Sequence, residues 1–455
     1  MPRLFIGNFD FEHRLAAPGR QLPAKLQRLN AELATSWLAI ADDGDYLWTP
    51  ELIEPSFFEE AVANKLPRVI PVVSLATVPS GVECIPWGWT DDIRALCDRH
   101  GWIRNDPPDQ AVRAANSRRL SSELEQEWRV GPPFSGEATS IEQIERYIAL
   151  HDTGSQWVIK AEFGMSGRER LLGSGIPRGA DRNWIEKRLK ANGIVFFEPW
   201  ITNIGEVGIQ IDIPRRGEPR LLEIVPMIAN HRGQYSGSRL PSHVSERSQV
   251  VLRPSEWGLA IDIALQAARR IQTFGYFGPL GIDVMQYQDE NQQQHVRPLQ
   301  DINARWTMGR LSLGFRKLLM PHESAEWLHG DLNLNRLVYV HSVLEILRRF
   351  LESKGMRLTS AHNTVVQAIL DQTGAFDEEE LSELLQDRLP RSVIYRTLSF
   401  LEEADQLRVV PTDHGPKLYL PMTAAARHCI RTSPAVVGET PASHASVLCI
   451  QTYEF

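Results

Sequence analysis

The chain has 455 residues, of which 42% are hydrophobic and 23% are charged, and its formal net charge at pH 7 is -8. This length exceeds what one hydrophobic core fills and predicts two to four domains. The acidic balance argues against a general nucleic-acid-binding surface, no run of about 18 apolar residues indicates a membrane span, and the N-terminal MPRLFIGNFD lacks the pattern of a secretory signal.

The four cysteines contain no CxxC pair. This pattern is typical of a reducing compartment and argues against both disulfides and a four-thiolate zinc site. We therefore expect a cytoplasmic protein.

Residues 1–110 predict an N-terminal α/β lobe. The apolar stretches 3–8, 38–41 and 68–76 are typical of buried strands. A helix is expected between Thr90, a favourable N-cap residue, and Gly101, a favourable C-cap residue. The Pro-containing stretch 105–110 predicts a linker.

Residues 111–335 predict a further α/β region with a mostly antiparallel sheet. Its helices are expected over 116–127, 140–152 and 257–275. Its strands are expected over 157–163, 194–201, 206–213, 220–228, 279–287 and 295–305, the last two joined by a polar hairpin at 289–294.

Residues 336–421 predict short helices followed by two short strands. The helices are expected over 338–355, 359–374, 377–389 and 390–407, and the strands flank a turn at 413–415. This order is typical of a winged-helix domain. Residues 422–455 form a tail of mixed composition that we expect to be irregular.

Polar side chains alternate along the strand that ends the 111–335 region. Asp301, Asn303 and Arg305 are spaced by two, so they are expected to face the same way. If the strands 281–287 and 295–303 pair across the hairpin, Asp283 lies near Asp301 and Asn303. Two carboxylates and an amide oxygen suit Mg²⁺, which takes its other ligands from water and substrate phosphates. The alternative is a set of satisfied polar groups at a strand end, which is the better explanation for any one acid alone.

A loop of small residues follows the strand that carries Lys160. The residues Gly164, Ser166 and Gly167 allow backbone N–H groups to approach phosphate oxygens, and Lys160 supplies a point charge. A lone loop of this kind is weak evidence for a nucleotide.

The segment IVFFEPWI predicts an adenine contact. Glu198 stands at the end of its apolar strand, and the backbone edge that continues through Trp200 and Ile201 offers hydrogen-bonding groups to a base. Glu206 is the candidate acceptor for ribose hydroxyls. A solvent-facing hinge is the alternative.

Taken in order, NSRRL, WVIK, GMSG, FEPWI, GE, GID and DINAR resemble the ATP-grasp superfamily of carboxylate–amine or carboxylate–thiol ligases, over about residues 116–315. The resemblance implies an ATP-grasp fold behind the N-terminal lobe, with ATP and Mg²⁺ as cofactors. It assigns Arg118 and Lys160 to the phosphates, Glu198 to adenine, and Asp283, Asp301 and Asn303 to the metal. Lys160 and Arg305 become the catalytic residues, with Arg305 facing the acyl substrate.

Two positions depart from the family pattern. The second metal acid is usually glutamate, and Asp301 is one methylene shorter, which favours binding one ion over bridging two. The first basic position holds Arg118 in place of lysine, a change compatible with phosphate binding.

The implied activity is that of an ATP-dependent ligase, which activates a carboxylate as an acyl phosphate for attack by an amine. Its expected partners are a small acid and a small amine, and a homodimer is a further expectation. The polar loop 229–239 could contact the substrate through His231, Arg232 or Arg239; an ordinary exposed hairpin loop is the alternative.

Residues 357–407 resemble the DNA-binding domain of the ferric uptake regulator family, whose recognition helix carries a core matched by Tyr395, Arg396 and Thr397. The resemblance implies DNA binding through residues 391–397, with Arg391 and Arg396 on phosphates or bases. Against it, residues 352–417 hold seven Lys/Arg and twelve Asp/Glu, and the family's metal-sensing motifs are not recognisable. A DNA-binding module, a protein-contact module and a relic all stay open. The alternative functions are therefore a nucleotide-responsive DNA-binding regulator and a catalytically inactive scaffold.

Overall fold

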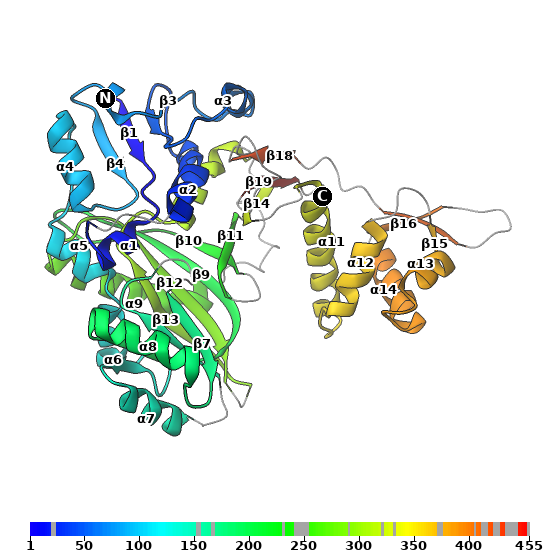
Figure 1. The fold of residues 1–455 in the computed structure, drawn as a ribbon. Helices are drawn as coiled ribbons and strands as arrows, with labels where there is room; N and C mark the ends of the chain where they lie inside the picture. The colour runs from blue at the N-terminus through cyan, green and yellow to red at the C-terminus, as the bar shows by residue number, and fades with distance from the viewer. Residues whose placement is uncertain are drawn as a thin grey trace. The chain divides into compact units, whose positions relative to one another are not determined.

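The computed structural model divides the chain into two compact units, Met1–Gly330 with Cys429–Gln451, and Asp331–His428 with Thr452–Phe455 (Figure 1). It describes every residue except 20–23, 152–155, 165–168, 230–232, 241–253, 290–291, 320–322, 331–333, 371–375, 405, 411–416, 422–427, 433–444 and 453–455. Each unit is a mixture of helices and sheets. No helix in the described parts of the chain combines the length and the hydropathy that a membrane crossing requires.

The N-terminal lobe is built on a parallel four-stranded sheet with the order β3-β2-β1-β4. Its strands are β1 (Arg3–Ile6), β2 (Tyr46–Trp48), β3 (Ile70–Val72) and β4 (Glu83–Pro86). Its helices are α1 (Phe11–Ala16), α2 (Ala24–Leu33), η1 (Ala34–Ala39), α3 (Pro55–Ala63), η2 (Leu75–Thr77) and α4 (Asp91–His100). The side chains of Leu4, Phe5 and Ile6 are fully buried, as expected of a central parallel strand covered on both faces.

The ends of α4 agree with the sequence prediction. The Thr90 side chain accepts a hydrogen bond from the backbone N–H of Ile93, and Gly101 takes the left-handed conformation with φ 66°. The expectation of a strand over 38–41 is wrong: Leu38 and Ala39 belong to the 3-10 helix η1, where both are buried. A four-residue apolar run fits either structure, because burial alone does not select a backbone conformation.

A second sheet, antiparallel and four-stranded, has the order β5-β8-β6-β7. Its strands are β5 (Gly136–Ala138), β6 (Gln156–Ala161), β7 (Arg170–Ser174) and β8 (Val195–Pro199), and the helices of this region are α5 (Asp109–Asn116), α6 (Arg118–Trp128), α7 (Ile141–His151) and α8 (Gly179–Asn192). One face packs on α7 and α8 through a core that includes Ile144, Ile159, Ile185 and Phe197. Because strand side chains alternate, Lys160 and Glu198 point to the opposite face.

The largest sheet has eight strands in the order β13-β12-β9-β10-β11-β14-β19-β18. Its strands are β9 (Thr202–Ile213), β10 (Arg220–Ala229), β11 (Tyr235–Leu240), β12 (Gly278–Gln288), β13 (Gln294–Asn303), β14 (Glu323–Gly330), β18 (His428–Arg431) and β19 (Ala445–Thr452). Helix α9 (Pro254–Thr273) packs on β9, β12 and β13, while α10 (Met308–Gly314) and η3 (Phe315–Leu318) follow β13. One hydrophobic core continues from this sheet into the N-terminal lobe and includes Phe5, Trp37, Ile209 and Leu311.

The chain returns to this sheet near its C-terminal end. Residues 422–455 were expected to be irregular, but they contribute β18 and β19. Between the two strands lies Thr432, which is fully buried. Its carbonyl accepts a hydrogen bond from Thr35 at 2.6 Å, and its hydroxyl accepts one from the Trp327 indole at 3.0 Å.

The second unit contains four helices and a small sheet among its described residues. The helices are α11 (Leu334–Ser353), α12 (Ser360–Leu370), α13 (Glu378–Leu385) and α14 (Arg391–Glu403), and the strands are β15 (Phe376–Asp377), β16 (Leu407–Val410) and β17 (Leu418–Pro421). The sheet is antiparallel, with β17 between β15 and β16. Its separate hydrophobic core includes Leu347, Val365, Leu381 and Leu398.

Candidate functional site

An acidic cluster lies where β12 and β13 pair. Asp283 and Asp301 are direct partners in the antiparallel register, and Asn303 is opposite Gly281. The Asn303 amide donates to Asp283 Oδ2 at 3.2 Å. The sequence prediction that these three side chains come together is therefore confirmed.

The Asp283 carboxyl is disfavoured as a charged group in this cluster. Burial first, and then the neighbouring charges of Asp301 and Glu206, together raise the pKa of Asp283 to about 7, against the opposing effects of Arg305 and of the hydrogen bond from Asn303. Burial also raises the pKa of Glu206, whose carboxylate accepts a hydrogen bond from Gln300 at 3.3 Å. The structure therefore places Glu206 beside the acids proposed to bind metal.

Arg118, the first residue of α6, faces this acidic cluster from the other side. Its guanidinium donates to Asp301 Oδ2 at 2.8 Å and to the Ala161 carbonyl at 3.3 Å, while its Nε is buried without a partner. The preceding Ser117 caps α6 and donates to Glu162 Oε1 at 2.7 Å. The start of α6 is thereby tied to the segment that follows Lys160.

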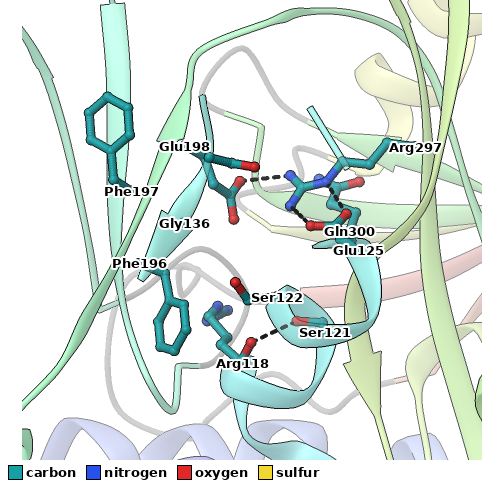
Figure 2. Close-up of a pocket in the computed structure, with 11 residues that line it drawn as sticks. Arg118, Ser121, Ser122, Glu125, Gly136, Phe196, Phe197, Glu198, Arg297 and Gln300 are labelled. Carbon is teal, nitrogen blue, oxygen red and sulfur yellow. Dashed lines mark hydrogen bonds and ion pairs between the residues drawn. The ribbon is translucent and has the colours of Figure 1, made fainter. Parts of the chain in front are cut away.

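A chain of four buried charges crosses from α6 to β6. Figure 2 shows three of them, Glu125, Arg297 and Glu198. Arg297 on β13 makes two hydrogen bonds to Glu125 on α6, at 2.6 and 2.8 Å. Its Nη1 lies 2.7 Å from Glu198 Oε2 on β8, and the Lys160 ammonium lies 2.8 Å from the same oxygen. These charges lie beside a pocket lined by residues of α6, β8 and β13, together with Ser135 and Gly136.

Burial and pairing act in opposite directions on these groups. Burial lowers the pKa of Lys160 and raises that of Glu125. For Glu198 burial opposes ionisation, yet Arg297 and Lys160 together hold its pKa well below the usual range. Glu198 is therefore an ionised carboxylate in a dry environment.

Arg305 is held at the boundary with the N-terminal lobe. Its side chain is ion-paired with Glu12 of α1, donates to Asn303 Oδ1 at 3.0 Å, and lies over the Trp87 ring at 5.2 Å from the centroid. Trp87 follows β4, and α1 follows β1, so Arg305 lies near the carboxyl ends of the central parallel strands. Open α/β sheets commonly bind ligands at this edge.

The other predicted residues lie along the same face or outside the described residues. Trp200 is 37% exposed, and its backbone N–H donates to the Gln156 carbonyl at 2.9 Å. The next residue, Ile201, is partly exposed. Gly164 is partly exposed beyond β6. Ser166, Gly167, His231 and Arg232 lie outside the described residues.

Arg239 is separate from the acidic cluster. It lies on β11 and forms an ion pair with Glu326 on β14 at 3.0 Å. Arg239 therefore belongs to a strand and not to the loop that was expected over 229–239, and its charge is paired within the sheet.

The acidic cluster has the donor chemistry of a hard cation site. Asp283, Asp301 and Asn303 supply oxygen atoms, and burial followed by the negative charges of Asp301 and Glu206 raises the pKa of Asp283, so a bound cation would favour its ionised form. Within the described residues no group of three or more His, Cys, Asp or Glu side chains is arranged to hold a metal. Mg²⁺ bound here would thus depend on the amide, on water and on phosphate oxygens.

Sequence reasoning missed Glu12, Glu125, Arg297 and Gln300. Arg297 and Gln300 lie in the predicted strand, and Arg297 shares the alternate positions of Asp301 and Asn303, yet its partner Glu125 lies 172 residues away in the chain. The pairing of β12 with β13 is also irregular between Asp283 and Met285, and no local sequence signal predicts such a bulge. Glu125 carried one usable signal, since it lies on the buried face of an amphipathic helix, where a charge requires a partner.

No protein-family model and no curated protein matches the chain. Among solved structures, N5-carboxyaminoimidazole synthetase from Staphylococcus aureus, complexed with ADP, matches with a TM-score of 0.40 and 11% identity over 72% of this chain and 82% of that chain. Biotin carboxylase from Campylobacter jejuni matches with a TM-score of 0.43 and 12% identity over 72% and 76%. The biotin carboxylase domain dimer of Hydrogenobacter thermophilus 2-oxoglutarate carboxylase, with MgADP and bicarbonate, matches with a TM-score of 0.46 and 11% identity over 99% and 86%. Values this low carry no argument about the activity of this chain.

Proposed function

We propose that the chain is an ATP-dependent ligase of the ATP-grasp type, which joins a carboxylate to an amine or a related nucleophile. The observation that carries the proposal is the meeting of Asp283, Asp301 and Asn303 on β12 and β13 with the basic side chains of Arg118, at the start of α6, and Lys160, on β6. Oxygen ligands and fixed cations in one partly dry site are what phosphoryl transfer requires.

Each group has a role in this proposal. Asp283, Asp301 and Asn303 would hold Mg²⁺, which when bound neutralises phosphate charge. Arg118 and Lys160 bind the phosphates, and Gly164, beyond β6, offers its backbone N–H to them. Arg305, fixed by Glu12 and Asn303, orients the substrate carboxylate for phosphorylation. The resulting acyl phosphate is then open to attack by the amine, so no protein nucleophile takes part.

The nucleotide base is proposed to bind at the exposed edge that follows β8. Trp200 and Ile201 offer backbone groups and an aromatic surface there. The Glu198 carboxylate is already shared by Lys160 and Arg297, so its contribution to adenine is expected to come from its backbone. Glu206, beside Asp283, is proposed to contact ribose hydroxyls.

Phosphate release tests this function directly. The chain is incubated with ATP, Mg²⁺ and a pooled set of small carboxylic acids and amines, and inorganic phosphate is measured with and without the pool. We expect pool-dependent release that Asp301→Asn lowers by at least about 100-fold, since charge stabilisation of this kind is worth several kcal/mol. Asp262→Asn, which changes an exposed acid on α9, serves as the matched control. Equal release from wild type and Asp301→Asn would contradict the proposal.

For the second unit we propose a winged-helix fold. The support is the order in the chain, in which β15 lies between α12 and α13 and the pair β16 and β17 follows α14, with β17 in the centre of the three-stranded antiparallel sheet. The contacts of α14 do not favour DNA binding: Arg391 is ion-paired with Glu379 at 2.8 Å, and Thr397 is buried with its hydroxyl bonded to the Val393 carbonyl. A contact with another protein suits this acidic unit better.

A further inference from the structure

We propose that Arg297, anchored by Glu125, is a positioning residue that leaves the Lys160 ammonium available to phosphate. The inference rests on the proposed function, because it concerns how the same site binds a nucleotide. It assigns a purpose to two charged residues that take no direct part in the reaction.

Two cations share one carboxylate oxygen of Glu198. Glu198 Oε2 accepts from Arg297 Nη1 at 2.7 Å and from Lys160 Nζ at 2.8 Å. The Glu198 and Lys160 side chains are each 11% exposed, and that of Arg297 is 5% exposed. One buried oxygen therefore divides its charge between two cations, of which Figure 2 shows Arg297.

Separating the buried ion pair of Lys160 and Glu198 requires free energy, and the presence of Arg297 changes how much. If Lys160 were the sole partner of Glu198, its movement toward phosphate would leave an uncompensated carboxylate in a dry environment, which is strongly unfavourable. With Arg297 in place, Glu198 keeps a cation when Lys160 turns to the nucleotide. Arg297 thus lowers the free energy required to move the Lys160 ammonium from Glu198 to a phosphate.

Glu125 keeps Arg297 in position. Its two carboxylate oxygens accept from Nε and Nη2, the planar two-bond geometry that fixes a guanidinium most firmly. The four charges Glu125, Arg297, Glu198 and Lys160 sum to zero. Removing Glu125 and Arg297 together would keep that sum and isolate the pair Glu198 and Lys160.

The test compares two ligands that differ only in phosphate. Calorimetry measures the dissociation constants of adenosine and of ATP with Mg²⁺ for wild type and for the double variant Glu125→Gln with Arg297→Gln. We expect ATP affinity to fall about tenfold, as for the loss of a charge-assisted contact, while adenosine affinity stays within about twofold. The matched control is Glu223→Gln with Arg316→Gln, which removes another ion pair of the same unit, 2.6 Å long, and should change neither constant.

A conservative variant keeps the test decisive if the double variant does not fold. Arg297→Lys loses the two-bond contact with Glu125 but retains a cation beside Glu198, so its ratio of ATP to adenosine affinity should fall less than in the double variant and stay within about threefold of wild type. A tenfold loss of that ratio in Arg297→Lys would overturn the inference. So would equal losses of ATP and adenosine affinity, or no loss of ATP affinity, in a folded double variant.

Failure of the inference can be told from failure of the proposed function. If wild type binds ATP and the folded double variant binds it equally well, only the positioning role of Arg297 is overturned. If wild type binds neither adenosine nor ATP, the proposed function falls, and this inference falls with it.

Discussion

At the scale of single residues, Asp301 pairs with one cation and is proposed to bind a second. It accepts from Arg118 at 2.8 Å, and the proposed function also requires it to bind Mg²⁺. A guanidinium and a metal ion compete for one carboxylate unless a phosphate draws the arginine away. Metal binding is therefore expected to depend on nucleotide.

Replacing Arg118 should make metal binding less dependent on nucleotide. In Arg118→Gln without nucleotide, Mn²⁺ affinity should rise about five- to tenfold, because Asp301 loses its competing cation, whereas ATP affinity should fall. Electron paramagnetic resonance of free Mn²⁺ measures the first effect. The adjacent exposed Arg119, changed to Gln, is the control, and an unchanged Mn²⁺ affinity in Arg118→Gln would contradict the competition.

Asp283 should make stability depend on pH in the metal-free protein. Its pKa, raised by burial and by its acidic neighbours to about 7, lies above the value of 3.8 expected in the unfolded chain. The unfolded chain thus loses this proton first, and the free energy of unfolding should decrease as pH rises from about 4 to about 7. Since the side chain is partly exposed, we expect a loss of about 2 kcal/mol.

Urea denaturation of wild type and Asp283→Asn measures this contribution. The variant should be the more stable protein at pH 8 and lose that advantage at pH 4.5, because an amide has no proton to release. Parallel pH profiles for the two proteins would show that Asp283 does not carry the effect.

At the scale of elements, the sequence predicted best where a local signal was sufficient. The helices α4, α6 and α7 have capping residues and an apolar face, and β12 and β13 are two runs joined by a polar turn. The strand β4 and the helix α8 were missed. Helix α8 buries only Ile185, so its sequence has almost no apolar periodicity to reveal it.

The residues of the candidate site also differ in whether a local sequence signal predicts them. Asp283, Asp301 and Asn303 follow from strand pairing, which sequence can indicate. Glu125 lies 172 residues from its partner Arg297, and Glu12 lies 293 residues from its partner Arg305. Contacts of that separation leave no local signal.

Two helical glycines, Gly314 in α10 and Gly258 in α9, should respond in opposite ways to replacement by alanine. A Cβ on Gly314 would lie 2.3 Å from the Ala39 carbonyl oxygen, a backbone atom that cannot move aside easily, so Gly314→Ala should lower the free energy of unfolding by about 2 kcal/mol or more. Gly258 in α9 has no atom within 4 Å of its Cβ position, so Gly258→Ala should raise it by about 0.5–1 kcal/mol. Denaturant unfolding measures both; a neutral Gly314→Ala would contradict the close approach.

At the scale of the whole molecule, the first unit is assembled from two separate stretches of chain. Residues 429–451 follow the second unit in sequence, yet Thr432 is buried against Thr35 and Trp327. The sequence of this segment showed no regular pattern, and its strands depend on pairing with a sheet whose other strands lie before the second unit in the chain. Its contribution to the first unit is a tertiary property.

Thr432→Val should therefore destabilise the first unit. The isosteric change removes the hydroxyl that accepts from the Trp327 indole, and an unpaired buried N–H costs about 1–3 kcal/mol. Thr273→Val, at an exposed hydroxyl of α9, is the control. Thermal unfolding followed by tryptophan fluorescence measures both, and equal midpoints would contradict the role of Thr432.

The central claim is that the carboxylates of β12 and β13 hold a divalent cation at the phosphates of a nucleotide. Crystals grown with Mn²⁺ and a non-hydrolysable ATP analogue test it through the anomalous scattering of manganese. We predict one strong peak within about 2.0–2.6 Å of oxygens of both Asp283 and Asp301, with phosphate oxygens completing its coordination. A nucleotide bound elsewhere, or manganese bound without either aspartate, would contradict the account.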